Sequence, residues 1–199
     1  MSLLSQAKVL GDWLKEEFAP PNYCRGTLTV LVPAALPSGA VLGTESVFSK
    51  YAAYDNSNPA AAAAILIEAQ AVEDAKTVTN IIDAANVSTI NFPADHGIVV
   101  GDIIAISGCT TDADLNANQI VLSVPTPTSL TCASASVTDT TYTDTTLRVT
   151  KISRPAACLV RGPALVNKDN LDYGTSDTSG KSAAVTDLAA LQIIARSGV

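Results

Sequence analysis

The sequence predicts a mainly β protein in which a small all-β module is inserted into a host domain. Three observations support this fold class. Apolar residues make up 47% of the 199-residue chain and charged residues only 16%, which is enough for a packed core and argues against disorder. Short runs rich in Val, Ile and Thr alternate with turn residues, as is typical of strands. The segment 77–147 has a composition of its own, which marks it as a separate module.

The first element is an N-terminal arm, predicted over residues 1–25. Its apolar residues recur at helical spacing, with two aromatic residues close to the same stripe: Leu3, Ala7, Leu10, Leu14, Trp13 and Phe18. Pro20 and Pro21 would end a helix there. Trp13 is the only tryptophan and lies outside the predicted β core, so we expect its apolar surface to be available for binding. The stripe either packs on the host domain or orders against a partner.

The host domain is predicted to comprise residues 26–76 and 148–199. Its main ambiguity is the segment 60–72, because Ala, Leu, Glu and Gln favour a helix. The segment runs directly into β-branched sequence, however, so we predict a strand over 65–68, with a short helix at 60–72 as the competing interpretation. We expect this strand to neighbour 157–161, with the module mounted on the loop between them.

The inserted module is predicted to span 77–147. This segment contains no Lys or Arg but seven Asp, which together equal the net charge of −7 of the whole chain. Its short β-branched runs are separated by Gly, Asp and Asn at turn-like spacing, and they lie at 78–82, 89–92, 102–107, 119–124 and 129–132. Such regular spacing favours a small sandwich or barrel.

Charge and hydropathy limit the classes of partner. A net charge of −7 argues against nucleic-acid binding, which needs a basic face to neutralise phosphates. No apolar run approaches the roughly 20 residues that a membrane-spanning helix requires, so we expect no membrane partner. The first residues are too charged and interrupted for a signal peptide. We therefore expect a soluble protein that is made and used without secretion.

Catalytic chemistry is not expected. His96 is the only histidine, and its position before Gly97 predicts a surface turn rather than a general base. The segment 112–116 has the first alternating ligands of a calcium loop, but Ala117 and Ser123 replace the required Gly and Glu, which favours a plain acidic turn. We predict no enzyme activity, no catalytic residue, no cofactor and no metal.

The four cysteines lack the close pairing of a zinc site: Cys24 and Cys158 in the host domain, Cys109 and Cys132 in the module. One disulfide within each region is an open interpretation. Assembly in a reducing cytoplasm favours free, buried thiols instead.

Several segments occur in the order found in one family of viral proteins. They are an entry turn, a strand with an aromatic-Asp ending, a small-residue strand and two segments after the interruption: 36–43, 50–55, 62–68, 158–171 and 187–196. With the Asp-Trp-Leu-Lys sequence at 12–15, they make the host domain resemble the head decoration proteins of tailed bacteriophages, the family of the lambda-type capsid-stabilising protein. The resemblance covers most of 1–76 and 153–199.

This resemblance implies a decoration-protein β fold of the β-clip or β-tulip type with a short C-terminal helix. It also implies a homotrimer that binds the major capsid protein at local three-fold positions on the outside of the expanded head. There it would stabilise the head against the pressure of packaged DNA. The protein would be made and assembled in the bacterial host cytoplasm and would reside on the outer surface of the virion head.

The resemblance also implies that the N-terminal arm contacts the capsid. We predict that the arm binds the capsid with Trp13 as its anchor, through Leu10, Trp13, Leu14, Lys15, Phe18 and Tyr23. The segment 27–32 would add to an exposed sheet edge of the capsid protein. The alternative function is a virion-surface adhesin whose module binds host-cell carbohydrate or protein.

Overall fold

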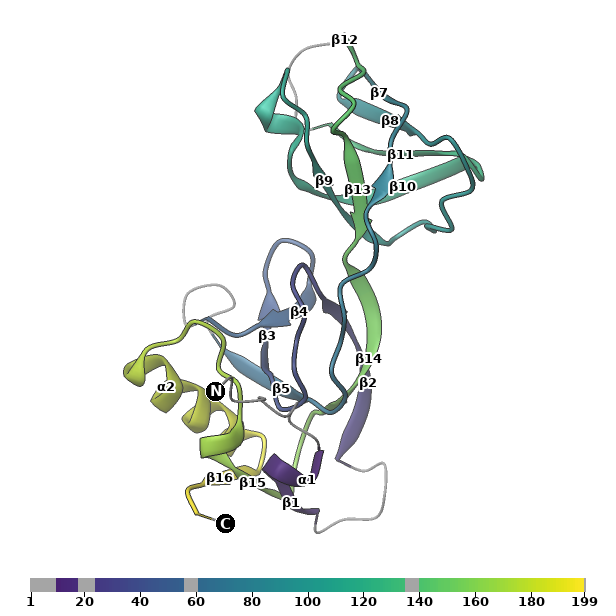
Figure 1. The fold of residues 1–199 in the computed structure, drawn as a ribbon. Coiled ribbons are helices and arrows are strands. Elements are labelled where there is room, and N and C mark those ends of the chain that lie inside the picture. The colour runs from purple at the N-terminus through teal and green to yellow at the C-terminus, as the bar shows by residue number, and fades with distance from the viewer. Residues whose placement is uncertain (1–9, 18–23, 56–60, 135–139, 199) are drawn as a thin grey trace, which may run out of the picture. The chain divides into compact units, whose positions relative to one another are not determined.

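The computed structural model describes residues 10–17, 24–55, 61–134 and 140–198. The chain forms two compact units (Figure 1). We call residues 1–71 and 154–199 the host unit, and residues 72–153 the inserted unit. Both units are built mainly of strands, as the sequence predicts, and the host unit ends with a short helix followed by one more strand.

A closed five-stranded barrel forms the first layer of the host unit, with the strand order β14-β2-β4-β3-β5. These strands are β2 (Arg25–Leu31), β3 (Val41–Glu45), β4 (Lys50–Ala53), β5 (Ala62–Leu66) and β14 (Ser153–Leu159). Val, Leu and Ala side chains, with Cys158, fill the barrel. Small side chains suit this interior because a barrel of few strands is narrow.

The strand β5 resolves the ambiguity over residues 60–72 in favour of a strand. Ala64 and Leu66 point into the barrel, whereas Ala62 and Ile65 face a second core outside it. Burial on both faces favours the strand over the intrinsic helix propensity of alanine. The predicted neighbour is also confirmed, since Cys158 of β14 lies opposite Leu66.

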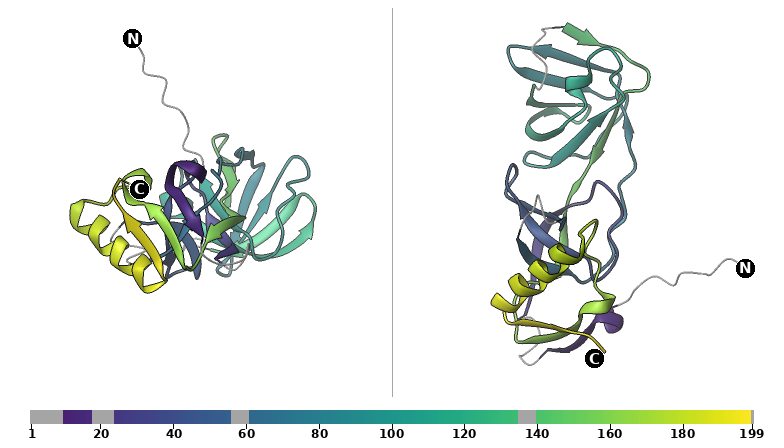
Figure 2. Two further views of the ribbon diagram at one scale, coloured as in Figure 1. Left: turned by 90° about the horizontal axis from the view of Figure 1, so that it is seen from below. Right: turned by 90° about the vertical axis from the view of Figure 1, so that its left-hand side faces the viewer.

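A three-stranded sheet and a helix complete the host unit. The sheet has the order β1-β15-β16, formed by β1 (Leu14–Glu17), β15 (Ala164–Asn167) and β16 (Ile193–Arg196). The four-residue helix α1 (Leu10–Trp13) precedes β1, and the short helix η2 (Lys168–Asn170) follows β15. The helix α2 (Thr178–Ala190) packs against β16 and β5 (Figure 2). Apolar side chains of α1, β1, β15, α2 and β16 form the second core together with residues of the barrel.

The inserted unit is one eight-stranded sheet with the order β12-β7-β8-β11-β10-β9-β13-β6. Its elements are β6 (Lys76–Thr77), β7 (Asn80–Ala84), β8 (Val87–Asn91), β9 (Ile103–Ser107), η1 (Ala113–Leu115), β10 (Asn118–Thr126), β11 (Ser129–Ala133), β12 (Thr140–Tyr142) and β13 (Arg148–Lys151). The start of β10 pairs with β9 and its end pairs with β11. Side chains from both halves of the sheet enclose one apolar core. All five predicted strands of the module are present.

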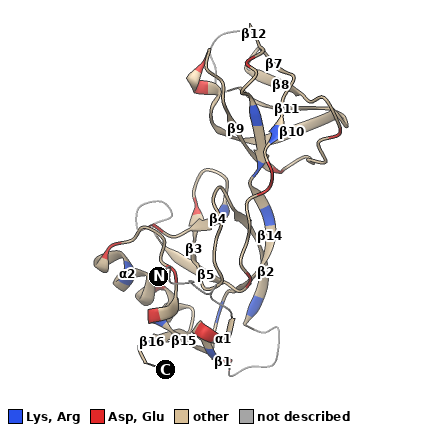
Figure 3. Ribbon diagram, in the orientation of Figure 1, with Lys and Arg blue, Asp and Glu red and all other residues tan. Residues whose placement is uncertain are grey.

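The boundaries of the inserted unit differ from the predicted 77–147. The strands β6 and β13 pair with each other, Lys76 opposite Val149 and Thr77 opposite Arg148, and β13 also pairs with β9. These two strands carry Lys and Arg side chains (Figure 3). The charge boundary therefore falls inside the unit, because its entry and exit strands are basic while the rest is acidic.

Candidate interaction site at the N-terminal segment

The described part of the predicted arm is integrated into the host unit. Helix α1 is only one turn long, and β1 follows it directly and pairs antiparallel with β15. The Asn170 side chain donates a hydrogen bond from Nδ2 to the backbone oxygen of Asp12 over 2.7 Å. Residues 10–17 thus contact the host unit through backbone and side-chain hydrogen bonds.

Trp13 does not lie outside the β core, contrary to the sequence-based prediction. Its side chain is fully buried in the core between barrel, sheet and helix. The indole Nε1 donates to Ser38 Oγ over 2.9 Å, and Ser38 Oγ donates to the backbone oxygen of Ile67 over 2.6 Å. Burial of a large ring and a satisfied indole N–H together stabilise the native position. Trp13 therefore cannot act as an exposed anchor.

Gly39 completes the pocket around Trp13. Its φ is +83°, a value that favours glycine, and a Cβ at this position would lie 2.8 Å from Trp13 Cδ1. The Ser-Gly pair at 38–39 was visible in the sequence as part of an entry turn. Nothing in its spacing indicated that a residue 25 positions earlier would pack there.

Leu10 and Leu14 are half-buried and pack against the same core as Trp13. The predicted helical stripe is therefore wrong for Leu14, which lies in a strand. Lys15, at a bulge of β1, and Glu16 are exposed. The predictions for Phe18 and Tyr23 lie outside the described residues.

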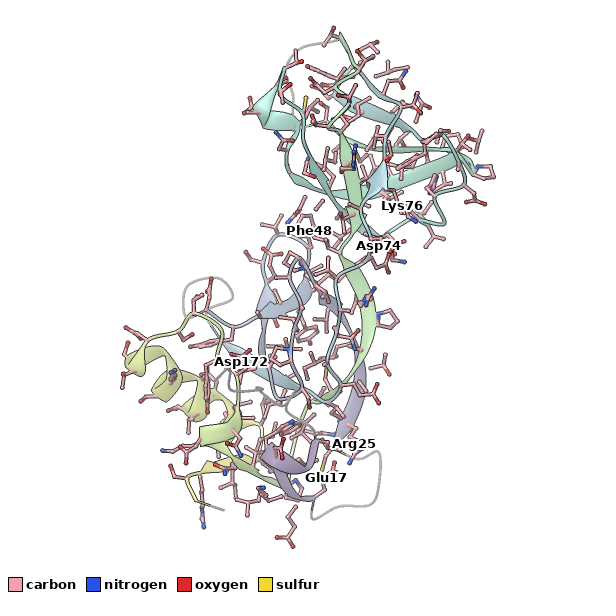
Figure 4. All side chains as sticks on the ribbon, viewed as in Figure 1. Glu17, Arg25, Phe48, Asp74, Lys76 and Asp172 are labelled. Carbon is pink, nitrogen blue, oxygen red and sulfur yellow. The ribbon has the colours of Figure 1, made fainter. Side chains whose placement is uncertain are left out.

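An ion pair joins β1 to β2 within the host unit. Arg25 Nε donates to both carboxylate oxygens of Glu17 over 3.1 Å, and Arg25 Nη2 contacts Glu17 Oε2 (Figure 4). The hydrogen bonding of Arg25 to the Glu17 carboxylate, in which Arg25 donates, raises the pKa of Arg25. The pair is partly exposed, so its main effect is to fix the position of β1 relative to β2 rather than to add much stability.

The segment 27–32 is not available for strand addition to a partner. Residues 27–31 belong to β2, which lies between β14 and β4 in the closed barrel. Val30 and Val32 point into the barrel core. Closure of the barrel satisfies the strand edges, so the predicted addition to a capsid sheet is wrong for this segment.

A groove of about 510 Å³ opens between η2 and α2. Its lining includes the side chains of Leu171, Tyr173 and Val185 and the basic residues Lys168 and Lys181. Burial, together with the nearby charge of Asp169, raises the pKa of Tyr173 to about 12. The Tyr173 hydroxyl donates to the backbone oxygen of Lys168 over 3.2 Å. These residues shape the groove, and no motif in the sequence indicated it.

His96 is buried rather than exposed on a turn, so that prediction is wrong. Its Nδ1 accepts a hydrogen bond from the Ile98 backbone N–H over 3.0 Å, and its ring lies 4.8 Å from that of Phe92. The segment 112–116 contains the short helix η1. Asp112 caps this helix, and its carboxylate also accepts a hydrogen bond from the Tyr142 hydroxyl over 2.9 Å. Among the residues that the structure describes, no group of three or more His, Cys, Asp or Glu side chains is arranged to hold a metal ion.

The four cysteines are free and buried, which agrees with the interpretation of free thiols. Burial raises the pKa of Cys132 and of Cys158 to about 12, and it also raises the pKa of Cys24 and Cys109. High thiol pKa values disfavour the reactive thiolate. These cysteines therefore serve as small core side chains.

Comparison with known proteins found no match to any family model and none to a curated protein. Within the described ranges, no helix combines the length and the apolar character needed to cross a membrane.

Proposed function

We propose that this chain is a structural protein of a tailed-bacteriophage virion that decorates the exterior of the expanded head as a trimer and stabilises it. The observation that carries the proposal is the architecture: a compact β-barrel unit whose neighbouring strands β5 and β14 flank a second, complete β unit. Such an arrangement lets one unit attach to a lattice while the other is displayed. The family resemblance of the host segments supports the same assignment.

The polar contacts of the chain are consistent with a structural role. Asp177 caps α2, and Glu17 pairs with Arg25. In the inserted unit, Lys151 pairs with Asp102 over 2.9 Å, and the buried Asp83 accepts hydrogen bonds from the hydroxyls of Ser88 and Ser134. Each of these groups organises the fold.

The capsid contact that we now propose differs from the one predicted from the sequence, in which Trp13 anchored a free arm. Because Leu10, Trp13 and Leu14 pack in the host core, they would hold the segment in place rather than touch the capsid. Within the described part of the segment, the exposed Lys15 would face the major capsid protein. The roles of Phe18 and Tyr23 stay predictions.

One surface of the inserted unit favours the adhesin as a second candidate function. The outward side chains of β7, β8 and β11 and the end of β10 carry no charge and are mostly hydroxyl or amide groups: Asn80, Ile82, Ala84, Val87, Thr89, Asn91, Ser123, Thr126, Ser129, Thr131 and Ala133. Rows of them hydrogen-bond across strands, as between Ser123 and Thr131 over 2.7 Å. An uncharged face fits a neutral host-cell carbohydrate or protein.

Co-sedimentation of the full-length protein with undecorated expanded heads tests the first proposal. We expect saturable binding to expanded heads and weak binding to unexpanded ones. Thr89→Lys and Thr131→Glu on the uncharged face should leave head binding unchanged. If the protein does not bind heads but binds bacterial cells in a way that these two substitutions abolish, the adhesin replaces the decoration protein.

A further inference from the structure

The three-stranded sheet of the host unit has two outer strands, β1 and β16, on either side of β15. Among the strands that the structure describes, none pairs with the outer edge of β1 or of β16. An outer strand presents backbone N–H and C=O groups that can pair with another chain. The sheet thus offers two edges for intermolecular contact.

The side chains of β16 would allow another strand to pair with its outer edge. Its side chains alternate, with Ile193 buried in the core and Ile194 43% exposed. Arg196 is its only charged residue. Natural edges that avoid pairing usually carry inward charges, lysine or proline, and the run from Ile193 to Ala195 has none of them. The β16 edge, which is four residues long, therefore presents a short apolar run for pairing.

The strand β1 is complementary to β16 in direction, and it carries Glu16 and Glu17 beside Lys15. Because β1 is antiparallel to β15 and β16 is parallel to it, β1 and β16 run antiparallel to each other. A copy of β1 placed beside β16 with the sheet continued in the same sense would form an antiparallel pair. The exposed Glu16 of that copy could then lie opposite or near the exposed Arg196.

We propose that the β16 edge docks the β1 edge of a second copy of this chain, so that the sheet continues from one subunit into the next. The contact is head-to-tail, and such contacts form a closed ring when the rotation between subunits closes. The number of subunits in the ring, three, rests on the proposed function. It names the surface through which a decoration trimer would assemble.

Disulfide trapping tests this contact in the free protein. Cysteines placed opposite each other on paired antiparallel strands come close enough for a disulfide. Two double variants, Glu16→Cys with Arg196→Cys and Glu16→Cys with Ile194→Cys, cover neighbouring registers. The matched control combines Glu16→Cys with Val47→Cys, since Val47 is 73% exposed and lies on the β3–β4 turn, away from the sheet. The four native thiols are buried, so we expect them not to compete in the cross-linking.

We expect oxidation of at least one double variant to give covalent dimers and trimers, with no larger species, while the control and the single variants remain monomeric. Three results would each overturn the proposal: no cross-linking in either register, cross-linking of the Arg196→Cys or Ile194→Cys single variant with itself, or a ladder that continues beyond the trimer. Head binding by the wild-type protein is measured separately. A protein that binds heads but gives no cross-link has the proposed function without this contact.

A charge on the edge provides a second readout. Ile194→Lys should weaken self-association in sedimentation velocity at high protein concentration and leave the Trp13 fluorescence spectrum unchanged. Val47→Lys is the control, and it should change neither quantity. Equal self-association of wild type and Ile194→Lys would contradict the contact through β16.

Discussion

Trp13 is the largest of the fully buried side chains, and its contacts connect three distant parts of the host unit. The indole packs over Gly39, donates to Ser38 and thereby orders the carbonyl of Ile67. A lone tryptophan in an N-terminal segment suggested an interface residue, but its partners are far away in sequence. Spacing alone could not reveal them, because only the closed barrel brings these residues together.

Replacement of Trp13 tests its place in the core. Trp13→Ala should lower the free energy of unfolding by about 3–5 kcal/mol, because it leaves a large cavity and removes the hydrogen bond that Ser38 Oγ accepts. Ser38→Ala should cost about 1–3 kcal/mol, since it leaves the indole N–H unsatisfied. Urea unfolding followed by circular dichroism measures both. If Trp13→Ala unfolds at the wild-type urea concentration, the residue is not a core residue and the free-arm interpretation returns.

Ala85, in contrast to Trp13, destabilises the part of the structure in which it lies, a turn. It joins β7 to β8 together with Asn86, and both have positive φ, +52° and +64°. A two-residue turn with positive φ at both positions favours Asn or Gly, and alanine there is strained. Ala85→Asn should therefore stabilise the inserted unit by about 0.5–1 kcal/mol. Ala94→Asn, at an exposed position without positive φ, is the control. A lower thermal midpoint for Ala85→Asn would contradict the turn geometry.

At the scale of elements, the local propensity of a segment and its tertiary burial can favour different secondary structures. The five β-branched runs of the module could be predicted because strand chemistry and turn residues agree there. The strand β5 was predictable only from its context, since its alanines favour a helix in isolation. The predicted helix around α1 was too long. A short apolar repeat suggested a longer helix, but Leu14 and the residues after it pair with β15 as a strand.

The start of α2 depends on the Asp177 carboxylate. It accepts from the Gly180 backbone N–H over 2.8 Å and from the Ser179 hydroxyl over 2.9 Å. These bonds, that of Gly180 first, lower the pKa of Asp177 below its ordinary value of 3.8. A lowered native pKa means that the carboxylate contributes stability above the ordinary value, and this contribution is lost as the pH falls through the native pKa.

Asp177→Asn should keep most of the cap and lose its share of the acid dependence, whereas Asp177→Ala should lower stability at neutral pH as well. The thermal midpoint of each variant, measured from neutral pH to below the ordinary Asp value, distinguishes them. A wild-type midpoint for Asp177→Ala at neutral pH would show that the cap does not support the helix.

For the whole molecule, composition located the inserted unit but not its ends. The absence of Lys and Arg identified residues 77–147, whereas the structural unit begins at 72 and ends at 153. The missing parts include Lys76 of β6 and all of β13, whose Lys and Arg residues made the composition there resemble that of the host segments. Of these, β13 contributes the fully buried Val149 to the core of the inserted unit.

The boundaries can be tested with two fragments of the chain. A fragment of 72–153 should unfold cooperatively, because it retains β13 and its pairing with β9. A fragment of 77–147 should lack cooperative unfolding, since it loses β13 and exposes the core that Val149 covers. Calorimetry distinguishes them. Equal cooperativity of the two fragments would show that β13 is dispensable and that the charge boundary is the structural one.

The most direct test of the account as a whole is an electron-microscopic reconstruction of expanded heads with and without the bound protein. A trimeric head decoration protein should give extra density on the outer surface at local three-fold positions. The host unit should fit this density as three copies, with the inserted units displayed from it. Density only at two-fold or five-fold positions, or no extra density at saturating protein, would contradict the assignment as a trimeric head decoration protein.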